Sequence, residues 1–578
     1  MKKYQLFRMC SYTKTKGCEY MTQFFIEANQ THHELQSSTS IDFQKQTYQI
    51  IVYGEVYNQD ILFTQLQQFF PLNNTLEEVV FYAWKHWGMQ AMQYLEGAYC
   101  FAISDHHKLI VCKDPMGLCP IYYTIYQDTC YVSNSISTIL EQSKRPAILT
   151  QDGVLELFSF GPSISEEKTL FAGIFALPMG CYLTFEKTAE VYKYYELPLR
   201  PHDDSLEDTK TRIQDLLNHS IQQQSKDCNS SFLSGGLDSS IITAQCASKH
   251  QDWRTYSLDY EGNQENFQHN LFQVSLDTPY IDAMQKKYPT SHTLFTITQD
   301  TLSQHLEEAM IAREQPGMAD VDASLLWLCK QVGKKDNIIL SGECSDEIFG
   351  GYPWFYRDEF KNLTTFPWLR SSKERISLLH DDVKNLPYQD YQQHQYHAIA
   401  DHIQYLDSDT KQDQFARLQT QLCLHWFMQT LVTRQVCEGK HAGVNIRAPF
   451  ANVKLLEYVY NIPWEMKFYN GQEKGILRQA YADILPEDVA FRKKNPFPKT
   501  HNPKYAQLVA DMLAQRLKDS SSPLHVLFNH DKLQELIDTK GSSFSLPWYG
   551  QLMSGPQLLA YLYQIDRWMH HFNIQLSI

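Results

Sequence analysis

The sequence predicts two consecutive domains, a mostly antiparallel β domain followed by a parallel α/β domain with many helices. Between residues 47 and 195, short β-prone runs alternate with turn residues, which is typical of an antiparallel β domain. After about residue 200, long helical stretches separate short apolar strands, the pattern of a parallel sheet. A chain of 578 residues is also too long for one ordinary hydrophobic core. We therefore assign residues 1–199 to the first domain and residues 200–578 to the second.

The strands of the first domain are predicted from four runs that are rich in β-branched and aromatic residues. These runs are TYQIIVYGEVYN, AYCFAISDHHKLIVCKD, PIYYTIYQDTCYVSN and GCYLTFEKTAEVYKYY. The segment Glu196–Ser205 combines two prolines with charged residues and has no periodicity, so it is the predicted linker.

Composition excludes several classes of protein. A formal net charge of -15 gives no general attraction for phosphate backbones, so we expect no nucleic-acid partner. The 13 cysteines contain no CxxC pair and no cluster at zinc spacing, which argues against a disulfide scaffold or a structural metal. No apolar run reaches the length of a signal peptide or a membrane span. We expect a soluble cytoplasmic protein with no membrane partner.

The first chemical motif is SFLSGGLDSS, which runs from Ser231 to Ser240. A short strand, a glycine-rich turn and a helix N-terminus in this order predict an anion site, since Gly235 and Gly236 let the backbone approach a ligand. An isolated SGG is more often a turn capped by serines, but this longer string favours a phosphate site, and Asp238 could hold Mg²⁺ beside it. The absence of a GK[ST] ending argues against a loop that serves γ-phosphate transfer. Further hydroxyl donors are Ser234, Ser239 and Ser240.

A second motif, SGECSDEIFGGYPWFYR, begins at Ser341 directly after the apolar strand predicted at Asn337–Leu340. Asp346 and Glu347 fall where a helix should start, and acids at that position can simply offset the helix dipole. Glu343, in contrast, stands in a turn at the carboxyl end of a strand, where α/β sheets bind ligands.

The third motif is YNGQEKGILRQAYADILP, in which the apolar residues recur at helical spacing. Lys474 and Arg478 are four residues apart and so share one face near the helix start. Such a pair is usually a solvated basic face. A cation at a helix N-terminus opposes the dipole, however, which favours a ligand-binding role for Lys474.

These motifs carry a family resemblance. The first string resembles the PP-loop of the ATP pyrophosphatases that cleave between the α and β phosphates, and the second resembles the SGE(G/C)(S/A)DE(I/V)FGGY motif of the asparagine synthetases. The chain is similar to the bacterial type of the glutamine-hydrolysing asparagine synthetase family, which implies a doubly wound parallel domain. It also implies that Asp346 joins Asp238 at magnesium pyrophosphate, that Glu343 serves formation and use of the acyl-adenylate, and that Lys474 stabilises charge on the α-phosphate. The other implied contacts are Leu233 and Leu258 at adenine, with Ser341 and Gly342 at the ribose and phosphate end.

The first domain resembles the N-terminal-nucleophile glutaminase domain of that family through YGEVYN, LEGAYCFA and KDPMGLCPIYY, which implies an Ntn-hydrolase-like fold. It departs from the pattern at each reactive position. Lys2 stands where the family has its nucleophilic cysteine, Tyr53 replaces an asparagine, and Leu76 or Glu77 stands where the family has the aspartate that binds the glutamine carboxamide. A start at Met9 would place Cys10 at position two, but the other absences would remain. We therefore expect a degenerate glutaminase domain.

A further departure lies at Val436–Asn452, VCEGKHAGVNIRAPFAN, where Asn445 and Asn452 replace family acids and leave the carboxylate substrate open. The resemblance implies an enzyme that makes asparagine from aspartate and ammonia, with ATP and Mg²⁺. A second copy of the chain, as a homodimer, is one partner to consider. Two alternatives remain: an amide-closing enzyme of the β-lactam synthetase or lasso-peptide cyclase type, and a non-catalytic regulatory paralogue.

Overall fold

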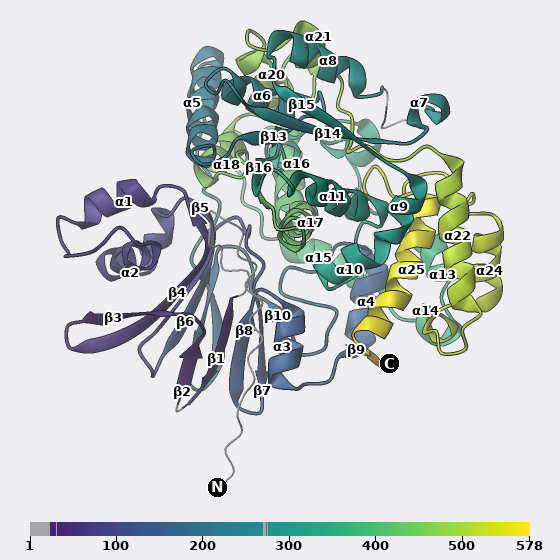
Figure 1. The fold of residues 1–578 in the computed structure, drawn as a ribbon, viewed down its shortest axis with the longest axis horizontal. Coiled ribbons are helices and arrows are strands. Elements are labelled where there is room, and N and C mark those ends of the chain that lie inside the picture. The colour runs from purple at the N-terminus through teal and green to yellow at the C-terminus, as the bar shows by residue number, and fades with distance from the viewer. Residues whose placement is uncertain (1–23, 31, 270–272, 274) are drawn as a thin grey trace.

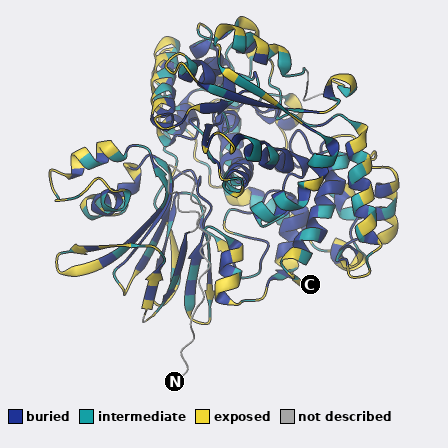
Figure 2. Ribbon diagram, viewed as in Figure 1, coloured by how far each residue is buried: buried dark blue, intermediate teal, exposed yellow. Residues whose placement is uncertain are grey.

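The computed structural model describes residues 24–578, with gaps at 31, 270–272 and 274. Figure 1 shows a β-rich part built from the N-terminal third and a larger helical part built around a second sheet. Figure 2 shows buried residues gathered in the sheets and in the helices next to them, and exposed residues on the outer helices. This arrangement confirms the predicted fold class.

Two antiparallel sheets form the N-terminal part. The four predicted β-prone runs all form strands here, and the turn between β7 and β8 is a two-residue turn in which Gln127 and Asp128 both have positive φ. Apolar side chains such as Ile26, Ile51 and Val111 pack in one cluster drawn from strands of both sheets. The five-stranded sheet has the order β10 (Phe175–Ala176), β7 (Tyr122–Tyr126), β8 (Thr129–Ser133), β1 (Phe25–Asn29) and β2 (His32–Leu35). The six-stranded sheet has the order β12 (Ala189–Lys193), β11 (Cys181–Phe185), β6 (Leu109–Lys113), β5 (Gly97–Ser104), β4 (Gln46–Val56) and β3 (Thr39–Phe43).

Helices α1 (Gln59–Leu66) and α2 (Leu76–Trp87) pack against the six-stranded sheet. Helix α2 begins at Thr75, whose hydroxyl accepts a hydrogen bond from the Glu78 N–H and so caps the helix.

The segment after β8 leaves the β part and joins the core of the C-terminal part. It contains α3 (Ile136–Ser143), β9 (Ile148–Thr150) and α4 (Gln151–Phe160). Strand β9 pairs in parallel with the last strand of the chain, β18 (Gln575–Ser577), and the ring of Phe158 lies 5.6 Å from the ring of Phe528. The two parts therefore share a core, and the boundary near residue 200 remains a proposal about the chain, not a break in its packing.

A parallel five-stranded sheet organises the C-terminal part. Its spatial order is β15 (Ser291–Ile297), β14 (Arg254–Tyr260), β13 (Ser230–Phe232), β16 (Ile338–Leu340) and β17 (Asn445–Arg447). Side chains of β16 alternate between two apolar clusters, which shows that both faces of the sheet are covered. The strand order reverses between β13 and β16, and ligands of doubly wound sheets bind outside the carboxyl ends of the strands at such a point.

The helices around this sheet complete the fold. They are α5 (Leu206–Gln224), α6 (Leu237–Ala247), α7 (Asn263–Asn266), α8 (Thr278–Lys287), α9 (Gln299–Gln304), α10 (Leu306–Arg313), α11 (Asp320–Val332), α12 (Ser345–Phe349), α13 (Ser372–Ser377), α14 (Asp381–Lys384), α15 (Tyr388–Ala400), α16 (Lys411–Leu422), α17 (Met428–His441), α18 (Val453–Asn461), α19 (Trp464–Lys467), α20 (Gly475–Tyr481), α21 (Glu487–Ala490), α22 (Pro503–Leu517), α23 (Leu524–Leu527), α24 (His530–Asp538) and α25 (Gly555–His571). Within residues 24–578, apart from the gaps, none of the helices combines the length and the apolar character that crossing a membrane requires.

Candidate active site

The loop that leaves β13 turns sharply into α6. Gly235 has a φ of +65°, and a Cβ atom on it would lie 2.6 Å from the Cβ of Tyr280, so only glycine fits this position. Gly236 caps α6, and the first amides of the helix face the end of the strand. The sequence motif therefore forms the strand, turn and helix N-terminus that it predicts.

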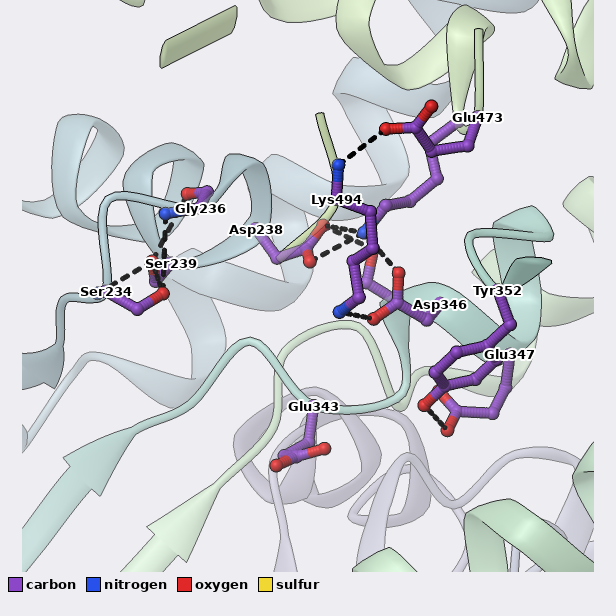
Figure 3. Close-up of polar contacts among 12 residues, drawn as sticks. Ser234, Gly236, Asp238, Ser239, Glu343, Asp346, Glu347, Tyr352, Glu473 and Lys494 are labelled. Atoms are coloured by element: carbon purple, nitrogen blue, oxygen red, sulfur yellow. Dashed lines mark hydrogen bonds and ion pairs between the residues drawn. The ribbon is translucent and has the colours of Figure 1, made fainter. Parts of the chain in front are cut away.

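Serine side chains hold this loop in shape (Figure 3). The Ser234 hydroxyl lies 3.2 Å from the Ser239 hydroxyl, and the Gly236 N–H donates to Ser234 Oγ at 3.4 Å. From outside the loop, Arg492 Nη1 donates to the Ser234 carbonyl at 3.1 Å. These contacts hold the loop in one conformation, which is what a preformed anion site requires.

The loop that leaves β16 packs against the first loop. The Ser341 N–H donates to the Arg447 carbonyl at 2.8 Å, which ties the loop to the neighbouring strand β17. A Cβ atom on Gly342 would lie 2.9 Å from the Cβ of Asp238, so glycine at 342 permits the close approach of the two loops. The short helix α12 then presents Asp346 and Glu347 in its first turn.

A buried lysine joins the two loops. Lys474 Nζ lies 2.8 and 2.7 Å from the two carboxylate oxygens of Asp238 and 2.7 Å from Asp346 Oδ1. Lys494 donates to the other oxygen of Asp346, and the Ser345 hydroxyl donates to Asp238 at 2.7 Å. Figure 3 shows the two aspartates facing one another across these ammonium groups.

The electrostatics of the cluster favour the charged forms. Burial alone would raise the pKa of Asp346, but the Lys474 and Lys494 ammonium groups outweigh it and hold this pKa well below its usual range. Burial would lower the pKa of Lys494, yet Asp346 and Asp238 raise it. For Glu347, burial, followed by the Asp346 charge, raises the pKa to about 8. Asp346 is therefore the carboxylate of α12 that stays ionised near neutral pH.

Lys474 and Arg478 are both buried and do not form a solvated face. Lys474 caps α20 with a φ of +54°, which places its side chain toward the two aspartates. Arg478 instead donates to the Glu473 side chain at 2.7 Å and to the Ala490 carbonyl at 2.6 Å. Of the two cations predicted to share a face, one serves the aspartates and the other supports the loops around them.

Glu343 lies apart from the aspartate cluster and points away from it in Figure 3. Its Oε1 accepts a 2.8 Å hydrogen bond from Arg434 Nη2 on α17. Helices α16 and α17 are joined through a π-helical segment, Cys423–Phe427, and π-helical insertions often occur at functional sites.

Both loops open into one cavity that encloses about 1520 Å³, its open mouth included. Gly235 and Ser240 are the two predicted site residues that do not line it. Ser240 is fully buried on the inner side of α6, so its hydroxyl is not presented to the cavity. Leu233, directly after β13, and Leu258 in the adjacent strand β14 both lie in the wall. The predicted site residues in the lining are Leu233, Ser234, Gly236, Asp238, Ser239, Leu258, Ser341, Gly342, Glu343, Asp346 and Lys474.

The sequence analysis missed three cations of the site. Lys494 pairs with Asp346, Arg492 supports the Ser234 loop, and Arg434 pairs with Glu343. The run RKKN contains two of them, but a basic run in a sequence is usually solvated, so only their partners in the fold mark these residues as part of the site. Arg434 stands in a helix and has no local motif around it.

The region Val436–Asn452 contributes less to the cavity than its altered sequence suggests. Asn445 begins β17 and Asn452 caps α18 by accepting the Leu455 N–H at 3.1 Å, and neither lines the cavity. Ile446 does line it. The replaced acids therefore have structural positions in this chain.

In the N-terminal part, structural contacts take up the positions that the resemblance assigns to glutaminase chemistry. Burial raises the pKa of Tyr53, and Lys440 Nζ from α17 lies 5.7 Å from the centre of its ring. Glu55 accepts a 2.8 Å hydrogen bond from Arg447 Nε in the other part of the chain. Leu76 and Glu77 lie in the first turn of α2. Lys2, Met9 and Cys10 lie outside the described residues.

The donor set fits magnesium held jointly with a phosphate ligand. Two carboxylates, Asp238 and Asp346, face one cavity beside the serine loop, and Mg²⁺ commonly binds one or two carboxylates together with substrate phosphates. Across the described ranges, no three His, Cys, Asp or Glu side chains gather into a metal site. The protein alone therefore provides an incomplete coordination shell, which phosphate oxygens could complete.

Comparisons with known proteins assign both parts of the chain to families. The family described as "Asparagine synthase" matches residues 212–570, and "Glutamine amidotransferase domain" matches residues 34–196. Asparagine synthetase [glutamine-hydrolyzing] 3 of Bacillus subtilis (strain 168) is 38% identical over 550 residues, which cover 93% of this chain and 89% of the relative. Asparagine synthetase [glutamine-hydrolyzing] 1 of the same organism is 24% identical over 79% of this chain and 77% of the relative.

One further relative and one solved structure have weaker similarity to the chain. Amidase chry2 of Gibberella zeae is 22% identical over 77% of this chain and 76% of that protein. Among solved structures, the glutamine phosphoribosylpyrophosphate amidotransferase from B. subtilis, complexed with ADP and GMP, matches with a TM-score of 0.21 and 12% identity, covering 44% of this chain and 62% of that one.

Proposed function

This chain belongs to the asparagine synthase family of carbon–nitrogen ligases, which use ATP to form an amide, and on that premise we propose that it converts aspartate to asparagine with free ammonia as the nitrogen source. The observation that carries the proposal is the pair of loops at the reversal point of the sheet. There Asp238 and Asp346 share Lys474 in one cavity with the serine loop. Such a site suits the cleavage of ATP between its α and β phosphates.

The proposed reaction has two steps. First, the side-chain carboxylate of aspartate attacks the α-phosphorus of ATP, a carboxyl O–P bond forms, and the bond to the bridging oxygen breaks, which releases pyrophosphate and leaves an aspartyl-adenylate. Ammonia then attacks the acyl carbon, the C–N bond forms, the C–O bond to AMP breaks, and a proton of the former ammonia passes to the medium. Activation is needed because a carboxylate resists nucleophiles, and an enclosed cavity protects the mixed anhydride from water.

Each cluster residue has a role in this scheme. Lys474 supplies a positive charge at the α-phosphate, where charge develops as the acyl oxygen attacks. The Ser234 and Ser239 hydroxyls and the amides at the start of α6 bind phosphate oxygens. Asp238 and Asp346 would hold Mg²⁺, which would neutralise the departing pyrophosphate. We assign Glu343, which lines the cavity beside Arg434, to the side where the acyl group and ammonia would meet.

The proposed use of ammonia rests on the N-terminal part. Tyr53 stands where the family places an asparagine, and Glu55 is engaged by Arg447. Removing one oxyanion-type donor lowers such rates by about 10²-fold or more, so the combined departures should abolish glutaminase activity.

The alternative amide-closing function receives less support from the site. It was favoured by the altered sequence Val436–Asn452, yet Asn445 and Asn452 do not line the cavity. A non-catalytic role is disfavoured because Asp238, Asp346 and Lys474 remain in mutual contact.

The test is to measure pyrophosphate release with aspartate, ammonium, ATP and Mg²⁺, and to quantify asparagine and AMP. The proposal expects the three products in equal amounts and no pyrophosphate release without aspartate. Turnover that requires a β-amino acid or a peptide carboxylate instead would support the amide-closing alternative, and no turnover with any carboxylate would support the non-catalytic one.

A further inference from the structure

Away from the phosphate side, the wall of the cavity is formed mainly by α11 and α17 and is mostly apolar. Met318, Leu325, Leu328 and Leu431 contribute to this wall. Two polar side chains, those of Arg434 and Gln435 on α17, stand out in it. They lie on the same wall as Glu343, on the side where an acceptor must reach the α-phosphate.

Most cations that line the cavity are already occupied. Lys474 and Lys494 pair with the two aspartates, while Arg478 and Arg492 bond to carboxylates and carbonyls of the surrounding loops. Lys493 is exposed at the cavity mouth, where its ammonium remains hydrated.

Arg434 differs from these cations in its position. Its side chain is 3% exposed and its Nη2 donates to Glu343, but its buried Nε has no hydrogen-bond partner among the described residues. Arg492 Nε, on the phosphate side, also lacks a hydrogen-bond partner among the described residues, so it is position that separates the two arginines: Arg434 lies beside Glu343. The Arg434 guanidinium carbon lies 5.1 Å from the centre of the Phe497 ring, which holds the group flat against the wall. A buried donor without a partner destabilises the protein, and a ligand carboxylate would satisfy it.

Gln435 has a hydrogen-bond acceptor that is likewise without a partner among the described residues. Its Nε2 donates to the Ile446 carbonyl at 3.2 Å, and this contact fixes the orientation of the amide. Its Oε1 is buried and accepts no hydrogen bond from any residue in the described ranges. Both side chains line one cavity, and each has one buried polar atom without a partner among the described residues, a cationic donor in Arg434 and a neutral acceptor in Gln435.

An amino acid carries the matching pair of groups on its α-carbon. A guanidinium presents donors in a fixed plane that suits a carboxylate, and an amide oxygen accepts from an ammonium. We propose that Arg434 and Gln435 recognise the acceptor, with Arg434 binding its α-carboxylate and Gln435 Oε1 accepting from its α-ammonium. The assignment rests on the proposed function and narrows the substrate class to α-amino acids that carry a carboxylate in the side chain.

The contact between Arg434 and Glu343 raises a competing explanation, in which Arg434 only positions Glu343. Positioning of Glu343 and recognition of the acceptor have different effects on the relative turnover of different acceptors. A positioning residue changes the turnover of every acceptor by the same factor, whereas a recognition residue changes the ratio between acceptors that possess or lack the group it binds.

The test compares aspartate with β-alanine, which lacks the α-carboxylate, and with succinate, which lacks the α-ammonium. Pyrophosphate release at saturating ammonium gives kcat/KM for each acceptor in the wild type, Arg434→Gln, Arg434→Lys and Gln435→Leu. The wild type should favour aspartate over both analogues by about 10²-fold or more, because a site built to bond a group rejects analogues without it.

Arg434→Gln should reduce the aspartate to β-alanine ratio to less than about tenfold and leave the aspartate to succinate ratio within about threefold, while Gln435→Leu should do the reverse. Arg434→Lys should retain part of the first ratio. KM for ATP should stay near its wild-type value, which shows that the cavity remains folded. His441→Gln, a change near the end of the same helix and outside the cavity lining, is the matched control.

Three results would overturn the assignment: an equal loss for all three acceptors in Arg434→Gln, an equal change of both ratios in Gln435→Leu, or a wild type that does not discriminate aspartate from β-alanine. A wild type that releases pyrophosphate with none of the three acceptors would instead remove the proposed function, and the recognition assignment would fall with it.

Discussion

The end of strand β4 at Tyr53–Glu55 in the N-terminal part and the loops after β13 and β16 in the C-terminal part show opposite uses of polar side chains. In the C-terminal part, Asp238 and Asp346 line a cavity and share the Lys474 ammonium, which lines the same cavity. In the N-terminal part, Tyr53 is enclosed beside Lys440 and Glu55 is bonded to Arg447. The comparison shows that polar side chains at strand ends of one chain can face a cavity or be bonded to another part of the chain, so function must be argued from each site separately.

The largest expected effect comes from the centre of the C-terminal cluster. Lys474→Ala removes the cation shared by Asp238 and Asp346, and pyrophosphate release should fall by about 10²-fold or more, since one preorganised electrostatic partner contributes that much. The rate of adenylation should fall more than ATP affinity, because the charge acts as the transition state forms. Rapid-quench rates and equilibrium ATP binding separate the two. Lys330→Ala, which breaks a surface pair with Glu308, is the control, and turnover of Lys474→Ala near that of the control would refute the assignment.

The second effect concerns the metal. Asp238→Asn removes one of the two proposed Mg²⁺ ligands, so pyrophosphate release should fall by about 10-fold or more and a higher Mg²⁺ concentration should restore part of it. A Mg²⁺ titration of the initial rate measures both quantities. Asp208→Asn, an exposed acid in the first turn of α5, should leave the titration unchanged. An unchanged titration in Asp238→Asn would place the metal elsewhere.

A smaller effect is expected from Glu55 at the end of strand β4. Glu55→Gln weakens the hydrogen bonds to Arg447, which keeps Asp227 as a partner, so stability should fall by about 1.5–3 kcal/mol while the synthetase rate changes less than about tenfold. Urea unfolding measures the stability, and pyrophosphate release measures the synthetase rate. Loss of the synthetase rate without loss of stability would mean that Glu55 acts on the synthetase reaction directly.

The smallest effect is expected from glutamine. Replacing ammonium with glutamine should give no amide product and no glutamate, both in the full chain and in a version that begins at Met9. Chromatography of glutamate and asparagine at pH 8 is the measurement. Glutamate released in step with amide product would show that a thiol such as Cys10 acts as nucleophile, and the contrast between the two parts would disappear.

The fold was predictable because its signals are local. The β-prone runs predicted the strands of the antiparallel sheets. The strand, glycine turn and helix of Ser231–Ser240 also appear as predicted. The excursion of α3, β9 and α4 into the other part was not predicted, because the partners of these elements lie hundreds of residues later in the chain.

The site was predictable where a motif surrounds the residue. Asp238, Glu343, Asp346 and Lys474 stand in distinctive strings, and the structure brings all four to one cavity. Arg434, Arg492 and Lys494 escaped because their importance depends on burial and on partners from distant segments. Ser240 belongs to the motif, yet the helical rotation turns it away from the cavity.

The pairing of β9 with β18 has a consequence for synthesis on the ribosome. Residues 148–150 are made more than 400 residues before their strand partner, residues 575–577, and α4 packs into a core that also contains late residues. During elongation this early segment must wait with its apolar surface uncovered, since domains usually fold as units while the chain emerges. The early segment can therefore complete its strand pairing only after residues 575–577 have emerged from the ribosome.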